Sequence, residues 1–103
     1  MNIIFEDYEL EQLYQGFKPK GKPKYQEVII KKLQKTIKKL ESCNRREDLM
    51  ILNSLNFESL EGYENRYSVR VDDSFRLEFS FQKENESDIA EYILVIRMSK
   101  HYK

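Results

Sequence analysis

The stretch YSVRVDDSFRLEF, residues 67–79, is the most informative part of the chain for its fold. Apolar and polar residues alternate on both sides of a short acidic break, which is the pattern of a β-hairpin with one buried face. The apolar positions of the two strands are Tyr67, Val69, Val71, Phe75, Leu77, Phe79 and Phe81. A three-residue turn pairs Val71 with Phe75 and keeps this set on one face, whereas a two-residue turn would set Val71 opposite Arg76. The favoured register predicts that Arg70 lies directly across from Arg76 on the other face.

The arginine pair has two interpretations. Like charges that face each other across a hairpin are unfavourable by a few tenths to about 1 kcal/mol unless an anion neutralises them. In the first interpretation Glu78 neutralises Arg70 and Arg76, and the polar side of the hairpin is an ordinary solvated surface. In the second, the two guanidinium forks bind the oxygens of a phosphate. The hairpin pattern alone leaves both open.

The segments around the hairpin predict an α+β fold. The expected elements are strands at 2–5, 67–71, 75–81 and 89–98, helices at 7–15 and 24–43, and a proline-containing loop at 17–23. Residues 44–48 lead into a short helical turn or loop. We expect the N-terminal strand and the two helices to pack on one face of an antiparallel sheet, which leaves the other face free for function.

The expected helix at 24–43 is amphipathic, with a lysine-coated outer side. Its apolar sector, at about 100° per residue, contains Tyr25, Ile29, Leu33, Ile37 and Leu40. The opposite sector includes Lys31, Lys32, Lys35, Lys38 and Lys39. By default such a face keeps a helix soluble, and the alternative is a surface that attracts a polyanion.

Composition bounds the class of protein. A chain of 103 residues is expected to be one domain, 1–103, with a single core. Its 18 basic and 18 acidic residues cancel, but residues 17–46 hold 11 basic residues against 2 acidic ones. The single cysteine, Cys43, predicts neither an intramolecular disulfide nor a zinc site. The sequence shows no signal-peptide layout and no long apolar run, so we expect a cytoplasmic protein without a membrane segment.

Three stretches carry a resemblance to a known family. They are FESLEG (57–62), the hairpin YSVRVDDSFRLEF, and SKHYK (99–103). In order and spacing the chain resembles the RelE/HigB/YoeB superfamily of bacterial type II toxins. These are small ribosome-dependent messenger-RNA endonucleases that a cognate antitoxin holds inactive. The resemblance implies a RelE-like toxin fold and an activity that needs no metal or other cofactor.

The resemblance also implies roles for individual residues. Glu58 matches a general base that takes the proton from a ribose 2′-OH, and Arg76 matches the arginine that stabilises charge on the phosphate, with Arg70 assisting. His101 matches the general acid, and Tyr102 a residue that positions substrate or stacks on a base. A carboxylate, an imidazole and a guanidinium together supply what attack by a 2′-OH requires. The helix lysines and Lys100 would contact RNA.

The chain departs from the family pattern at two places. Glu61 replaces the lysine that commonly follows the leucine of FESLEG, and Lys100 and Lys103 flank the His-Tyr ending. Glu78 therefore competes with Glu58 as the base, and His101 could be an incidental terminal histidine.

The sequence thus favours a toxin that cleaves messenger RNA in the ribosomal A site, with an antitoxin, the ribosome and messenger RNA as partners. Two alternatives stay open. One is a toxin similar to ParE, which acts on DNA gyrase and is not a nuclease. The other is a degenerate module that only binds an antitoxin-like partner.

Overall fold

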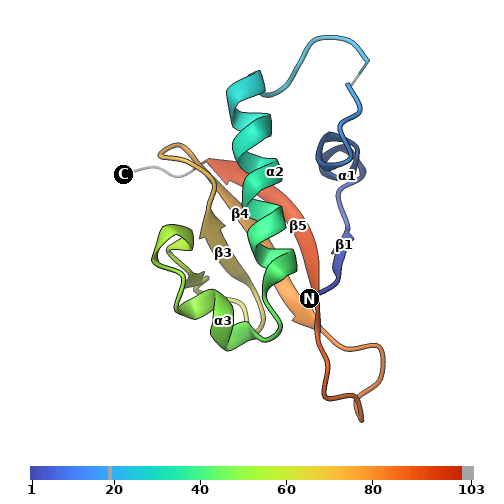
Figure 1. The fold of residues 1–103 in the computed structure, drawn as a ribbon, viewed down its shortest axis with the longest axis vertical. Coiled ribbons are helices and arrows are strands. Elements are labelled where there is room, and N and C mark those ends of the chain that lie inside the picture. The colour runs from blue at the N-terminus through green and yellow to red at the C-terminus, as the bar shows by residue number, and fades with distance from the viewer. Residues whose placement is uncertain (19, 101–103) are drawn as a thin grey trace.

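A computed structural model describes residues 1–18 and 20–100 of the chain. Its elements are β1 (Ile3–Phe5), α1 (Tyr8–Tyr14), α2 (Glu27–Ser42), α3 (Arg46–Met50), the 3₁₀ helix η1 (Asn53–Leu55), β2 (Glu58–Ser59), β3 (Tyr67–Arg70), β4 (Phe75–Gln82) and β5 (Tyr92–Lys100). The strands form one sheet in the order β1-β5-β4-β3-β2, and α2 lies across it (Figure 1). The predicted α+β class is confirmed.

The hairpin register is the predicted one. Arg70 pairs with Arg76 and Val69 with Leu77, and the amide of Val71 donates to the carbonyl of Phe75 at 3.0 Å. The turn is closed by Asp72, whose Oδ1 accepts hydrogen bonds from the amides of Ser74 (2.8 Å) and Phe75 (2.7 Å). Asp72 in the acidic break therefore has a structural function, because its carboxylate accepts hydrogen bonds from two backbone amides.

The N-terminal strand was predicted to pack with the helices on one face of an antiparallel sheet, but it is instead a member of the sheet, because its backbone pairs with β5. The pairs β2–β3, β3–β4 and β4–β5 are antiparallel, whereas β1 runs parallel to β5 and pairs Ile3 with Ile93. The sheet is consequently mixed, with β1 at one edge and the two-residue β2 at the other. Strand β2 was not predicted, because two exposed residues carry no alternation.

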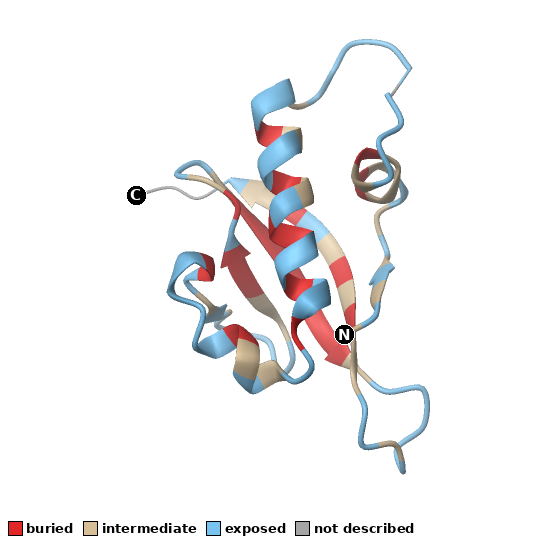
Figure 2. Cartoon of the chain, viewed as in Figure 1, coloured by how far each residue is buried: buried red, intermediate tan, exposed pale blue. Residues whose placement is uncertain are grey.

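The core lies between α2 and the sheet. Leu33, Ile37 and Leu40 of α2 are fully buried, as are Leu77 and Phe79 of β4. Figure 2 shows buried residues along β4 and on the turns of α2. Burial of such aliphatic and aromatic side chains stabilises the fold by about 1.5–3 kcal/mol each.

Two predicted starts differ from the structure by three residues, whereas the other predicted boundaries of strands and helices differ by at most two. Helix α2 begins at Glu27 rather than at residue 24, and Tyr25 precedes it and packs edge-on against Phe75 with ring centroids 5.6 Å apart. Strand β5 begins at Tyr92 rather than at residue 89, because Asn85 and Asp88 form a turn and Ile89 is exposed. Both errors arose because apolar residues outside an element were counted as part of its buried stripe.

The second face of the sheet is not the open surface that the sequence suggested. Four polar residues on it are buried: Ser68, Arg76, Glu78 and Ser80. The segment from η1 to β2 folds back beside β3, and the carbonyl of Asn56 accepts a hydrogen bond from Arg76. The interpretation of this face as ordinary solvated sheet is therefore wrong. None of the described helices is long and apolar enough to cross a membrane.

Candidate functional site

Arg76 is the centre of the buried polar face. Its side chain is 6% exposed. Its Nε donates to the hydroxyl of Ser68 at 2.8 Å, and its Nη2 donates to the carbonyls of Asn56 at 2.5 Å and Ser68 at 3.2 Å. These bonds hold the plane of the guanidinium in one orientation, because they engage two of its three nitrogens.

Glu58 lies beside this arginine at the rim of the face. Its Oε2 is 3.7 Å from Nη2 of Arg76, and its side chain is 47% exposed. The separation exceeds the roughly 2.7–2.9 Å of a charge-assisted hydrogen bond, so the carboxylate is a near neighbour rather than a tight partner. The site therefore has a solvent-accessible carboxylate, that of Glu58, next to the nearly inaccessible guanidinium of Arg76.

Local structure explains where Glu58 sits. Asn56 ends η1 with a φ of 45°, a left-handed conformation that asparagine tolerates better than most residues. The next residue, Phe57, stacks on Tyr67 with centroids 5.3 Å apart and also contacts the rings of Phe79 and Phe81. Strand pairing then sets Glu58 directly across from Ser68, the residue that binds Arg76.

Charge and burial act on Arg76 in opposite directions. Burial lowers its pKa from the ordinary value, the Glu58 carboxylate raises it, and the charge of Arg70 lowers it further. A guanidinium is so strongly basic that it stays protonated near neutral pH even with a lowered pKa. The site therefore presents a permanent positive charge in a partly dehydrated setting, where its interaction with an anion is stronger than in water.

Arg70 faces Arg76 in the register but has a different environment. Its side chain is 46% exposed, and its Nη2 is 2.5 Å from Oδ1 of Asp73 in the hairpin turn. Glu78 does not neutralise the pair, contrary to the first interpretation, because it binds Arg66 at 3.4 Å and Arg97 at 3.1 Å. Each of the opposed arginines has its own acidic neighbour.

Glu78 is also poorly placed to act as a base. Burial alone would raise its pKa, but hydrogen bonds from Ser99 and Arg97, the charge of Arg97 and a hydrogen bond from Arg66 outweigh burial and lower it. A carboxylate with a lowered pKa that is already bound by two guanidinium groups is a weak proton acceptor. Between the two candidates, the geometry favours Glu58.

The remaining predicted residues do not gather at Arg76. Lys31, Lys32, Lys35, Lys38 and Lys39 are all exposed on α2. Helix α2 covers the core face of the sheet, so Lys31, Lys35 and Lys38 lie on the other side of the sheet from Arg76. Lys39 reaches η1, the segment before Glu58, where its Nζ donates to the hydroxyl of Ser54 at 3.2 Å. Lys100 pairs with Phe75 on the core face, and it lines a groove of about 510 Å³ with Tyr25 and Phe75. His101 and Tyr102 lie outside the described residues.

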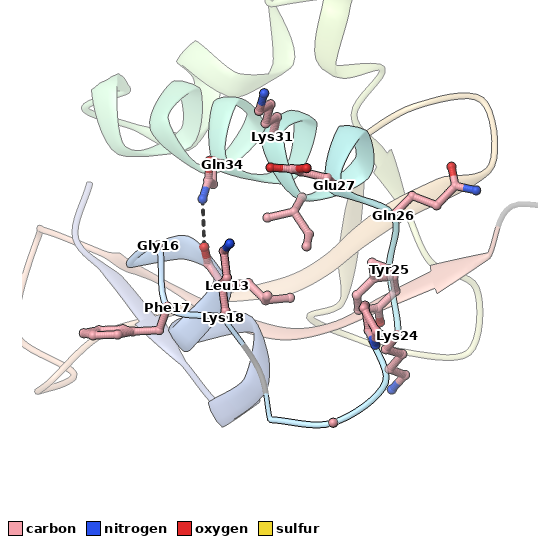
Figure 3. A pocket seen from close by; sticks show the side chains of 13 residues that line it. Leu13, Gly16, Phe17, Lys18, Lys24, Tyr25, Gln26, Glu27, Lys31 and Gln34 are labelled. Atoms are coloured by element: carbon pink, nitrogen blue, oxygen red, sulfur yellow. Dashed lines mark hydrogen bonds between the residues drawn. The ribbon is translucent and has the colours of Figure 1, made fainter.

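A larger groove, of about 750 Å³, lies elsewhere, between α1 and the first half of α2. Figure 3 shows Gln34 of α2 bonded to Leu13 of α1 along it, at 2.8 Å, with Lys31 nearby. It contains none of the buried polar residues of the sheet. Within the part of the chain that the structure describes, no group of three or more His, Cys, Asp or Glu residues could hold a metal ion.

Sequence reasoning missed several residues of the polar face, among them Asn56, Arg66, Ser68 and Arg97. Ser68 could have been found, because the same alternation that set Arg70 and Arg76 on one face also includes it. Arg97 could not, because a bulge in β5 shifts the register, so that Glu78 pairs with Arg97 but Phe79 pairs with Val95. Asn56 contributes only a backbone carbonyl, for which the sequence carries no signal.

Comparison with known proteins identifies a family and a similar fold. Residues 3–94 match the family described as RelE-like toxin of type II toxin-antitoxin system HigB, a range that includes Glu58, Arg70 and Arg76. No curated protein matches the chain. Among solved structures, the fold is similar to a YoeB/ParE toxin from Agrobacterium tumefaciens, with a TM-score of 0.60 and 13% identity, over 99% of this chain and 100% of that one.

Proposed function

The chain belongs to the HigB-like family, the RelE-like toxins of type II toxin-antitoxin systems, and we propose that it cleaves messenger RNA in the ribosomal A site. The family implies an antitoxin as a partner. The observation that carries the nuclease proposal is the rigidly held Arg76 guanidinium with the accessible Glu58 carboxylate 3.7 Å away.

The proposed reaction uses the ribose beside the scissile phosphate. Glu58 takes the proton of the 2′-OH, and the oxygen attacks the neighbouring phosphorus while the bond to the 5′-oxygen breaks. The leaving oxygen takes a proton from a general acid, the role that the family resemblance gives to His101. The products are a 2′,3′-cyclic phosphate and a 5′-hydroxyl. Since DNA lacks the 2′-OH, only RNA is a substrate.

Arg76 is suited to stabilise the charge that develops on the phosphate oxygens. Its bonds to Ser68 and Asn56 exist before substrate arrives, so little reorganisation is needed during the reaction. Among the described residues, Nη1 of this arginine has no hydrogen-bond acceptor in the protein. A phosphate oxygen can therefore bind Nη1, while Glu58, which is 3.7 Å from Nη2 and not hydrogen-bonded to it, stays available to the 2′-OH.

The lysines of α2 have a separate role in this proposal. Lys31, Lys35 and Lys38 lie on the far side of the sheet from Arg76, so they are not placed to contact the same few nucleotides, whereas Lys39 lies nearer the site, beside Ser54. We assign them to ribosomal RNA, whose phosphates attract clustered lysines in a salt-dependent way. The ribosome would supply the positioning of the message, and little cleavage of free RNA is expected.

The test is cleavage of a message on programmed ribosomes, followed by primer extension. We expect Glu58→Gln to slow single-turnover cleavage by about 10²–10⁴-fold, the usual contribution of a general base. Glu61→Gln removes the same charge three residues away and is the matched control, with a rate near wild type. Arg76→Ala and His101→Ala should also slow single-turnover cleavage. Wild-type rates in all three site variants would exclude the mechanism.

A second candidate function follows from the name of the structural relative, which covers ParE as well as YoeB toxins. A toxin similar to ParE would inhibit DNA gyrase and would not need the Glu58–Arg76 pair for toxicity. A supercoiling assay with purified gyrase separates the two functions. Inhibition of supercoiling with no cleavage on ribosomes would favour this second candidate.

A further inference from the structure

A buried carboxylate that the proposed cleavage does not use lies next to Arg76 on β4. Glu78 has a side chain only 7% exposed, yet it contacts two arginines that reach the surface. Its Oε1 accepts from Nη1 of Arg66 at 3.4 Å, and its Oε2 accepts from Nε of Arg97 at 3.1 Å. One anion thus holds two cations, and the cluster keeps a net positive charge.

The two arginines differ from an ordinary internal ion pair. The side chain of Arg97 is 64% exposed and that of Arg66 is 24% exposed. Within the described residues, Glu78 engages one nitrogen of each guanidinium, which leaves further N–H donors of both groups for a ligand. The buried carboxylate fixes where these donors lie, while its pairing with them offsets the free-energy penalty of burying it.

An exposed aromatic ring belongs to the same cluster. The guanidinium of Arg66 lies over the ring of Tyr63 at 4.5 Å from the centroid, and Tyr63 is more than half exposed. The loop that carries the ring is closed by a hydrogen bond from the amide of Leu60 to the carbonyl of Arg66, 2.9 Å long. A cation and a ring held together at a surface are the elements that bind unpaired nucleotides.

The cluster is one step along the strand from the proposed cleavage site. Glu78 and Arg76 are two residues apart on β4 and point to the same face, so they are separated by about 7 Å. The pairing Glu58–Ser68–Glu78–Arg97 crosses four strands in one row. An extended RNA strand whose scissile phosphate is at Arg76 would therefore bring an adjoining phosphate near Arg97.

We propose that Arg66 and Arg97, positioned by Glu78, bind the phosphate of a nucleotide adjacent to the scissile one, and that Tyr63 stacks on its base. This inference rests on the proposed function for its ligand, a single strand of RNA. Arg76 acts at the reacting phosphate, whereas this second site would fix the register of the strand. The alternative is that the two arginines serve only to neutralise Glu78.

The experiment measures binding without chemistry. Ribosomes are programmed with a message whose attacking 2′-OH is replaced by a 2′-O-methyl group, and affinity for the protein is measured with and without a neutral methylphosphonate at each flanking phosphate. Wild type is compared with the Arg66→Gln/Arg97→Gln double variant. Lys83→Gln, which removes an exposed cation of the β4–β5 loop, is the control.

We expect one flanking methylphosphonate to weaken binding of wild type and of the control on the order of tenfold, which is typical of a lost charge-assisted hydrogen bond. The double variant should bind the charged and neutral messages equally. Equal weakening in wild type and the double variant, or no weakening in either, overturns the inference. An abasic nucleotide at the same position should likewise weaken wild type but not Tyr63→Leu.

Two further measurements keep the outcomes distinct. If the double variant is unfolded, Arg97→Gln alone replaces it, because that side chain is mostly exposed. Cleavage of the unmodified message by wild type tests the proposed function separately. If wild type cleaves the message but the methylphosphonate weakens binding equally in wild type and the double variant, the nuclease proposal stands and the second site is excluded. If wild type does not cleave but the methylphosphonate weakens binding of wild type alone, the RNA-binding site stands and the nuclease proposal is excluded.

Discussion

Arg70 and Arg76 are directly paired across β3 and β4, yet the first is solvated beside Asp73 and the second is buried against Ser68 and Asn56. The like charges are tolerated because each has its own acidic neighbour and because only one of them is desolvated. Identical residues in identical register thus have different chemistry, and the difference arises from the segment that folds over Arg76.

We predict that the two arginines respond unequally to lysine. Arg76→Lys removes the guanidinium N–H groups that donate to the carbonyls of Asn56 and Ser68. Because a lysine ammonium cannot reproduce the planar set of donors, the free energy of unfolding should fall by about 1–3 kcal/mol. Arg70→Lys keeps an exposed charge near Asp73 and should change it by less than about 1 kcal/mol. Urea denaturation of both variants measures this, and equal losses would contradict the burial of Arg76.

We predict that Phe57 controls the position of Glu58. Phe57→Leu removes the ring that stacks on Tyr67, and the adjoining carboxylate then loses its fixed place. Single-turnover cleavage should slow by roughly 10- to 100-fold, because small displacements of reacting groups have large effects on rate. Phe17→Leu alters an exposed ring far from the site and is the control. A rate loss equal in both variants would argue against positioning.

The hairpin shows what alternation can and cannot predict. The apolar set at 67–81 fixed the register, the turn and the Arg70–Arg76 pairing, because a slip of one residue would move that set to the solvent face. The environment of Arg76 was not predictable, because it depends on the backbone of residues 56–59, a segment without periodicity. Alternation says which residues share a face, but it does not say what covers that face.

The candidate site was predictable to the same extent. Glu58 and Arg76 were recognised from the residues of FESLEG and the hairpin, and the structure sets their side chains side by side. The Arg66–Glu78–Arg97 cluster was missed, because it requires the bulge in β5 and three separate strands or loops to be placed in space. His101 and Tyr102 stay predictions, since they lie outside the described residues.

We predict that acid weakens the fold. The pKa of Glu78 is lowered, because the hydrogen bonds and charges around it outweigh the raising effect of burial, and the pKa of Glu91 is lowered mainly by its hydrogen bond from Arg46. In the unfolded chain these groups return toward their ordinary pKa of 4.5. The unfolded state therefore binds more protons below that pH, and stability is lost as the pH falls from it through the lowered values.

Urea denaturation at a series of pH values measures this effect. We expect the free energy of unfolding to change little between pH 6 and 8 on account of these two groups, and to fall below about pH 4.5. Glu91→Gln should flatten part of the slope, whereas Glu84→Gln, an exposed loop substitution, should leave it unchanged. A slope that is the same in all three proteins would show that the Arg46–Glu91 ion pair does not contribute.

The last prediction concerns three lysines of α2, Lys31, Lys35 and Lys38. Because these side chains lie on the opposite side of the sheet from Arg76, they should affect binding of the ribosome but not the chemistry. A variant with Lys31, Lys35 and Lys38 changed to Gln should bind ribosomes more weakly, and the slope of log affinity against log salt should fall by about two to three. At saturating ribosomes its cleavage rate should match wild type.

The matched control changes Lys18, Lys20 and Lys22 to Gln, which alters the net charge equally in the loop before α2. If attraction depended only on total charge, both triple variants would lose affinity and slope to the same degree. If the α2 face is a defined contact, only the first variant should do so. If the first variant cleaved more slowly than wild type at saturating ribosomes, the lysines would act at the reacting strand. That result would contradict the prediction.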